Sequence, residues 1–118
     1  MNSPHQEIEA VIRAELAEAL RSKREGKQGR ARVCARRAAG WAVGWHKEAS
    51  GLAKSHINAL EQLRWLANQP DAGSRLQEAA ARLITKLAPD GSLPFEQDPI
   101  EDARKIITAL LGIDIELA

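Results

Sequence analysis

The sequence predicts an all-α fold, namely an antiparallel up-and-down bundle of four to five helices. Its 118 residues are the length of one domain. Apolar residues make up 44% of the chain but aromatic residues only 3%, so alanine and leucine must fill the interior, as in closely packed helices. The apolar residues recur at helical spacing, and several segments open with a capping pattern and end near glycine or proline.

The first helix is predicted to begin at Ser3 and to end near Gly26. Ser3 supplies an N-cap, Pro4 suits the first helical position, and glycine favours a helix end. The apolar spacing of this segment predicts one buried face, formed by Ile8, Val11, Ile12, Leu16 and Leu20. The connection over residues 26–29 is short, which favours an antiparallel second helix.

The second helix is predicted over about residues 30–48 and is expected to be the central one. One broad arc of it carries mostly small residues together with two tryptophans: Ala31, Cys34, Ala35, Ala38, Trp41, Ala42 and Trp45. Gly40 and Gly44 are each about 1 kcal/mol less favourable in a helix than alanine. We therefore expect another helix to cross closely at these two glycines.

Three further helices are predicted in the second half of the chain. The third covers about residues 55–68, the fourth opens with a capping box at Ser74, and the fifth opens with an N-cap at Asp98 and ends at Gly112. Their buried faces are expected to contain Ile57, Leu60, Leu63, Leu66, Leu76, Ala80, Leu83, Ile84, Leu87, Ile100, Ala103, Ile107, Leu110 and Leu111.

Charge is distributed unevenly along the chain, although the formal net charge is only +1. A net charge this small excludes an argument for nucleic-acid binding from bulk electrostatics. Basic residues dominate from residue 21 to residue 37, whereas acidic residues dominate from residue 90 to the end. The plainest interpretation is that these two regions pair with each other, within one chain or between two copies.

Few residues are suited to chemistry of their own. Cys34 is the only cysteine, which excludes an internal disulfide and is typical of a reducing, cytoplasmic environment; we expect a buried structural thiol. His5, His46 and His56 form no i,i+3 or i,i+4 pair, so no metal site is predicted. The chain contains no phosphate-binding loop, and its longest apolar runs are too short to span a membrane.

The strongest functional lead is the set of basic residues around the second helix. Lys27, Arg30, Arg32, Arg36 and Arg37 are candidate contact residues for nucleic acid, a nucleotide or an acidic protein partner, because cationic side chains bind phosphates and carboxylates. The alternative is a solvated face whose ion pairs contribute little to stability. On the binding interpretation, reversing Arg32 and Arg36 to Glu weakens binding without unfolding the protein.

The three tryptophans, Trp41, Trp45 and Trp65, allow three interpretations. Trp41 and Trp45 lie one helical turn apart, and Trp65 lies on the predicted third helix. With so few other aromatic residues, they are expected to pack in the core, to form a dimer interface, or to provide a platform on which a base or another ligand stacks. The sequence does not choose among these three roles.

The order of the helices resembles that of HEPN domains. Residues 29–40 are similar to the alanine-rich second helix of that family, residues 54–63 to the opening of its next helix, and residues 93–112 to its closing helix. The resemblance implies an up-and-down bundle that forms a homodimer in a prokaryotic cytoplasm. Many members are toxin-type RNases or partners of small nucleotidyltransferases, which makes RNA, a nucleotide or such an enzyme the implied partner.

The catalytic motif of that family is absent. It consists of an arginine followed by four to six residues and then a histidine. An arginine would have to lie within residues 39–41 for His46, or within 49–51 for His56, and neither stretch contains one. No catalytic residue is therefore carried over, and the sequence leans against an enzyme.

We predict a non-catalytic binding or assembly module with a basic surface on its second helix. Residues 1–112 form the bundle domain, and residues 113–118 form a short tail that either pairs in extended form or frays. One alternative is a divergent RNase or nucleotide-processing enzyme that uses His46 or His56 together with the arginines. Another is a structural subunit of a two-component complex. Neither a cofactor nor a metal is predicted.

Overall fold

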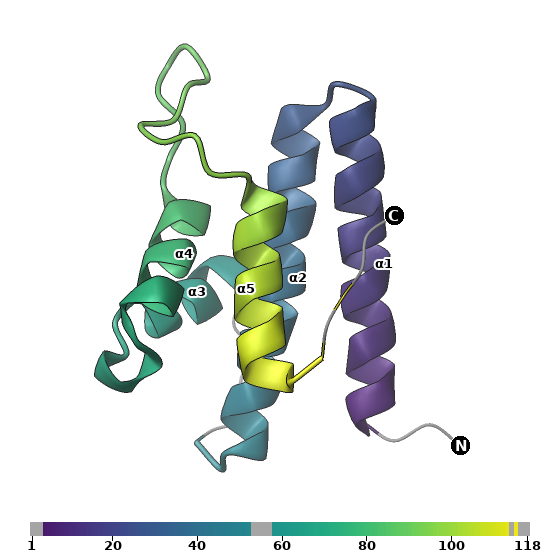
Figure 1. Cartoon of the computed structure of the whole chain (residues 1–118), viewed down its shortest axis with the longest axis vertical. Coiled ribbons are helices and arrows are strands. Elements are labelled where there is room, and N and C mark those ends of the chain that lie inside the picture. The colour runs from purple at the N-terminus through teal and green to yellow at the C-terminus, as the bar shows by residue number, and fades with distance from the viewer. Residues whose placement is uncertain (1–3, 53–57, 114, 116–118) are drawn as a thin grey trace.

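The computed structural model describes residues 4–52, 58–113 and 115, and every regular element within them is helical (Figure 1). In chain order the elements are α1 (Pro4–Arg24), α2 (Gln28–Ala49), α3 (Ala59–Ala67), the 3-10 turn η1 (Pro70–Ala72), α4 (Ser74–Ile84) and α5 (Pro99–Leu111). The predicted all-α bundle is thus confirmed for the described part of the chain. Ser3 and the predicted start of the third helix, residues 55–57, lie outside the described residues.

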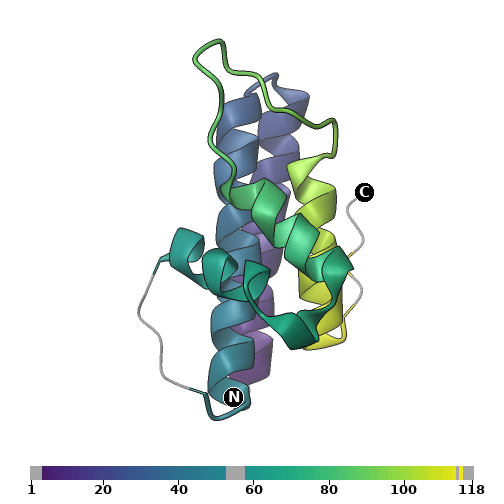
Figure 2. The same cartoon turned by 90° about the vertical axis from the view of Figure 1, so that its left-hand side faces the viewer.

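The helix α2 lies at the centre of the bundle and contacts α1, α3, α4 and α5. Residues 25–27 join α1 to α2, and Gly26 takes a left-handed backbone (φ 78°) there, so the two helices run antiparallel (Figure 1). In contrast, α5 lies along α2 and runs in the same direction, because the chain first returns through α3 and α4. The two short helices α3 and α4 lie across the long ones (Figure 2).

The closest helix crossing occurs between α2 and the start of α3. A Cβ atom added to Gly40 would lie 2.7 Å from the Cβ atom of Ala59, a separation that real Cβ atoms do not tolerate. A Cβ atom on Gly44 would lie 3.2 Å from the side-chain nitrogen of Gln62. The predicted crossing at these two glycines is confirmed, and it explains why α2 carries residues that are intrinsically poor in helices.

Small side chains form the centre of the core. The fully buried side chains of α2 are Ala31, Cys34, Ala35, Ala38, Ala39, Ala42 and Val43. Larger residues from the other helices surround them, chiefly Ile12, Leu16, Leu63, Leu66, Leu83, Ile106 and Ile107. Ile115 is also buried, so this part of the predicted tail packs against the core. Cys34 is buried as predicted.

Three residues that were predicted on buried faces are exposed instead: Val11, Leu60 and Leu87. Trp41, on the small-residue arc of α2, is exposed as well. Val11 is exposed because α1 packs mainly on α2, which covers the neighbouring face with Ile12. Leu87 is exposed because α4 already ends at Ile84, so Leu87 is not on a helix. Leu60 lies on the side of α3 opposite to the face that packs into the bundle.

The predicted helix ends are confirmed for α5 but not for the start of α4. The side chain of Asp98 accepts a hydrogen bond from the backbone N–H of Ile100 at 2.8 Å, and Gly112 ends α5 in the left-handed conformation. The capping box at Ser74 is wrong, because Gly73 is the N-cap and Ser74 is already helical. At α3 the side chain of Asn58 is the N-cap, a role the sequence analysis had not assigned to it.

Candidate functional site: a groove beside Trp41

The predicted basic residues lie in two different environments, and Arg32 is buried. Its Nη2 atom donates hydrogen bonds to the carbonyl oxygens of Arg82 at 2.7 Å, Leu83 at 3.1 Å and Thr85 at 2.7 Å. Carbonyl groups at the C-terminal end of a helix have no partner within the helix, so Arg32 caps α4. Burial lowers the pKa of Arg32 from its ordinary value. Arg32 is therefore a structural residue and not part of an exposed binding surface.

A buried ion pair lies beside Arg32 and joins α4 to α5. The carboxylate of Asp102, which is only 1% exposed, accepts two hydrogen bonds from the guanidinium of Arg82, at 2.9 and 2.8 Å. These hydrogen bonds raise the pKa of Arg82 above its ordinary value. The Nζ atom of Lys105 lies 3.7 Å from the same carboxylate. We call Arg32, Arg82 and Asp102 the α4–α5 junction.

The remaining basic residues form mostly local ion pairs. The guanidinium of Arg30 lies 2.9 Å from the carboxylate of Glu18, and the ammonium of Lys27 lies 3.0 Å from that of Glu25. Lys23 pairs with Asp98. The basic segment was expected to form ion pairs with the acidic C-terminal region, and the pair of Lys23 with Asp98 is of this kind. Lys27 and Arg30 instead pair with acidic residues in or next to α1.

Arg36 and Arg37 are the remaining members of the predicted basic surface. Arg36 is half-buried, and desolvation lowers the pKa of its guanidinium. Arg37 is exposed on α2, one turn before Trp41. Only Arg37 of these two lines a cavity.

The tryptophans differ in exposure. Trp41 is 50% exposed, so core packing is wrong for this residue. Trp45 and Trp65 are partly buried and pack against the edge of the core. The ammonium of Lys47, itself buried, lies 5.0 Å from the centre of the Trp65 ring, which is a cation–π contact.

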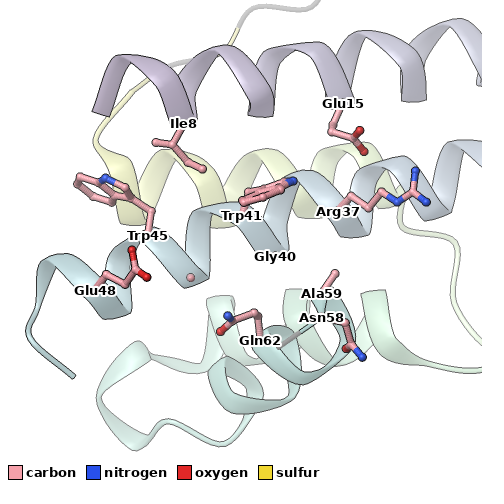
Figure 3. A pocket seen from close by; sticks show the side chains of 11 residues that line it. Ile8, Glu15, Arg37, Gly40, Trp41, Trp45, Glu48, Asn58, Ala59 and Gln62 are labelled. Atoms are coloured by element: carbon pink, nitrogen blue, oxygen red, sulfur yellow. The ribbon is translucent and has the colours of Figure 1, made fainter. Parts of the chain in front are cut away.

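Trp41 and Trp45 line a cavity of about 450 Å³ where α1, α2 and the start of α3 meet (Figure 3). We call it the Trp41 groove. Its lining consists of Ile8 and Glu15 from α1; Arg37, Gly40, Trp41, Gly44, Trp45 and Glu48 from α2; and Asn58, Ala59 and Gln62 from the start of α3.

The middle of the groove is apolar because the close crossing of α2 and α3 requires residues without side chains. Gly40 and Gly44 have no side chains, so part of the lining is bare helix backbone, next to the methyl group of Ala59. The rings of Trp41 and Trp45 rise from α2, one turn apart, and Ile8 points toward them from α1 (Figure 3). The same glycines that permit the crossing thus leave space beside it.

Three charged residues of the described lining lie around this apolar centre: Glu15, Glu48 and Arg37. The Oε2 atom of Glu15 is buried and has no hydrogen-bond partner among the described residues. A buried acceptor without a donor typically costs about 1–3 kcal/mol of folding free energy. Glu15 points from α1 toward α2, whereas the guanidinium of Arg37 extends along α2 away from the tryptophans (Figure 3). Two carboxylates and one guanidinium give these lining residues a formal charge of −1.

Sequence reasoning missed Glu15, although a signal for it exists. Ile8, Ile12 and Ala19 lie along one side of α1, and Glu15 falls into the same row at helical spacing. A carboxylate at a position where the row otherwise carries apolar residues is unusual. Finding it requires knowing which side of α1 faces α2, and the sequence analysis placed Val11 on that face instead.

Two other candidate residues, His46 and Cys34, do not line the groove. His46 is half-buried at the end of α2 and does not line the cavity, and His56 lies outside the described residues. Cys34 is buried in the core. Within residues 4–52, 58–113 and 115, no three histidine, cysteine or acidic residues gather closely enough to hold a metal ion.

A second cavity lies between α4 and α5 and is lined by Arg75, Arg104 and Lys105 among others. Two of these cations have acidic neighbours on α5. The guanidinium of Arg104 lies 3.1 Å from the carboxylate of Glu101, and Lys105 is the residue near Asp102. This cavity therefore does not present a concentrated positive charge.

Comparisons with protein-family models, with curated proteins and with solved structures find no match for this chain. The resemblance to HEPN domains stays a prediction, as do the homodimer and the nucleotidyltransferase partner that it implies. No described helix is both long and apolar enough to cross a membrane.

Proposed function

We propose that the chain is a non-catalytic binding module and that its ligand site is the Trp41 groove. The observation that carries this proposal is the half-exposed Trp41 beside a cavity whose centre is apolar. Sites for small ligands are typically concave and mostly apolar, with a few polar groups at defined positions. The groove has this composition, and its volume of about 450 Å³ is in the range of such sites.

The exposed part of Trp41 supplies a driving force for binding. A tryptophan side chain buries roughly 200 Å² when it is fully covered, so covering the remaining half removes about 100 Å² from water. At about 25 cal/mol per Å² this area corresponds to about 2.5 kcal/mol before the costs of association. The rings of Trp41 and Trp45 are also stiff, which keeps the entropy lost on binding small.

The described part of the groove lining favours binding over catalysis. Glu15 and Glu48 are its acidic side chains, and serine, threonine, cysteine, lysine and histidine are missing from the described residues that line it. Nucleophilic catalysis depends on one of these side chains next to a base. The alternative of an RNase that uses His46 or His56 stays a prediction, because His46 does not line this cavity and His56 lies outside the described residues.

The proposal is tested with a neutral apolar dye, Nile red, whose fluorescence rises when it leaves water. We expect the wild-type protein to bind the dye and Trp41→Ala to bind it about tenfold more weakly, since the largest apolar surface of the groove is then lost. Both proteins are compared by circular dichroism to verify that the substitution leaves the helices intact.

Leu87→Ala is the matched control for this experiment. Leu87 is 47% exposed, similar to Trp41, but it does not line the groove. We expect its dye affinity to stay within about twofold of the wild type. Equal losses in Trp41→Ala and Leu87→Ala, or no loss in either, would contradict the assignment of the groove as the binding site.

A further inference from the structure

We infer that the Trp41 groove selects small organic cations, molecules with an aromatic or aliphatic body and a protonated amine, and that Glu15 recognises the amine. This inference rests on the proposed function, because it names the class of ligand for the same groove. It is drawn from two features of the described residues: the unpartnered oxygen of Glu15 and the exposed ring of Trp41.

The Glu15 carboxylate is a hydrogen-bond acceptor that lacks a donor. An ionised carboxylate only accepts hydrogen bonds, and the Oε2 atom of Glu15 receives none from the described residues although it is buried. Buried polar groups in proteins are almost always satisfied, so an exception at the wall of a cavity calls for a donor from outside the chain. A ligand N–H group that carries positive charge gives the strongest hydrogen bond to such an oxygen.

The aromatic rings favour the same chemistry. The face of a tryptophan ring attracts cations, including protonated amines, through its quadrupole. Trp41 lies next to Glu15 in the lining, whereas Trp45 lies one turn farther along α2 beside Ile8, so an ammonium near the carboxylate also approaches the Trp41 ring (Figure 3). The apolar body of the same ligand then covers the bare backbone at Gly40 and Gly44.

The charges of the groove discriminate against anions. Glu15 and Glu48 both repel a phosphate or carboxylate, and Arg37 is the one opposing cation among the described residues of the lining. Its guanidinium extends away from Trp41 and Trp45, so it does not neutralise the region that an apolar ligand body occupies (Figure 3). A nucleotide therefore fits this groove less well than an amine does, although a nucleotide was among the ligands expected from the basic residues.

The test uses three probes with the same phenyl body and different head groups: phenethylammonium, phenethyl alcohol and hydrocinnamate. Dissociation constants are measured by isothermal titration calorimetry at one pH and one salt concentration. We expect the ammonium to bind about tenfold more tightly than the alcohol, and the carboxylate to bind most weakly. In Glu15→Gln we expect the preference for the ammonium over the alcohol to fall to about twofold or less.

Glu7→Gln is the matched control, because Glu7 is an exposed residue of α1 and its substitution removes the same charge from the same helix. We expect Glu7→Gln to retain the tenfold preference. Should Glu15→Gln fail to fold, the comparison of the three probes with the wild-type protein still decides the inference, and Glu48→Gln provides a second variant in the groove, with a smaller expected loss.

The outcomes separate the inference from the proposed function. If none of the three probes binds and Nile red does not bind either, the proposed function itself is wrong. If the alcohol binds as tightly as the ammonium, or if Glu15→Gln keeps the full preference, the groove binds ligands but Glu15 does not select cations. A wild-type dimer that Trp41→Ala converts to monomers would also overturn the inference, because a second copy would then occupy the groove.

Discussion

The α4–α5 junction and the Trp41 groove both place charged side chains against the central helix, but these side chains differ in how they are hydrogen-bonded. At the junction, Arg32 donates to three carbonyl oxygens and Asp102 accepts two hydrogen bonds from Arg82, so the chain satisfies its own buried charges. In the groove, Glu15 has a buried oxygen that receives no hydrogen bond from the described residues, and Trp41 leaves half of its surface in water.

The difference lies in whether the described residues satisfy the buried charge. The basic residues of α2 were the strongest lead from the sequence, yet Arg32 is used to hold α4 in place. A ligand platform was one of three interpretations of the tryptophans, and the mostly apolar lining of the groove includes two of them, Trp41 and Trp45. A charge that the chain satisfies internally stabilises the fold, whereas an unsatisfied acceptor beside a cavity is available to a ligand.

The largest expected effect is at Asp102 in the junction. Asp102→Ala leaves Arg82 without its anionic partner at a largely buried site, and breaking a buried ion pair from one side typically costs about 3–5 kcal/mol of unfolding free energy. Urea denaturation measures this loss. Glu101→Ala is the control, since Glu101 forms only an exposed pair with Arg104, and we expect a loss of about 0.5 kcal/mol or less.

Arg32 is expected to have the next largest effect. Arg32→Met keeps much of the buried hydrocarbon but removes all three hydrogen bonds to the end of α4, which we expect to cost about 2–3 kcal/mol in the same denaturation experiment. Arg37→Met, on the exposed side of α2, is expected to change stability by about 0.5 kcal/mol or less. Similar losses in the two variants would remove the distinction between the structural and the exposed arginines.

The close crossing beside the groove predicts that alanine substitutions at two glycines of α2 change the stability of the protein in opposite directions. Gly40→Ala places a methyl group 2.7 Å from the Cβ atom of Ala59, and we expect this overpacking to cost about 1–2 kcal/mol in spite of the better helix propensity of alanine. Gly29→Ala has open space around the new methyl group and is expected to stabilise the protein by about 0.5 kcal/mol. Stabilisation by both substitutions would contradict the crossing.

A comparably small effect on stability is expected at Trp41. Because half of its surface is already exposed and alanine favours the helix, Trp41→Ala is expected to lower the unfolding free energy by only about 1–2 kcal/mol, even though the same substitution weakens Nile red binding. Thermal denaturation followed by circular dichroism measures this change. A loss of about 3 kcal/mol or more would show that Trp41 packs as a core residue after all.

Patterns within one segment predicted much of the fold. The N-cap at Asp98, the helix ends at Gly26 and Gly112 and the close crossing at Gly40 all follow from the local chemistry of single residues. Contacts between distant segments were not predictable in this way. The arrangement of arginines in the sequence does not reveal that Arg32 donates hydrogen bonds to carbonyl groups at the end of α4, fifty or more residues away.

The candidate site depends still more on distant contacts. Trp41 falls on the small-residue arc of α2, yet its ring is half exposed where α1, α2 and the start of α3 meet. Glu15 becomes informative only when the side of α1 that faces α2 is known. Both residues are therefore visible in the sequence, but their roles emerge from how three helices meet.

The most direct test of the groove is a nuclear magnetic resonance titration of isotope-labelled protein with phenethyl alcohol, a neutral probe. The three tryptophans supply three separate indole N–H signals, and Trp65 is not part of the groove lining. We expect the Trp41 signal to shift most, together with the backbone signals of Gly40 and Ala59, while the Trp65 signal stays in place. Shifts centred on the N-terminal arginines of α2, with the Trp41 signal unchanged, would contradict the assignment of the groove as the ligand site.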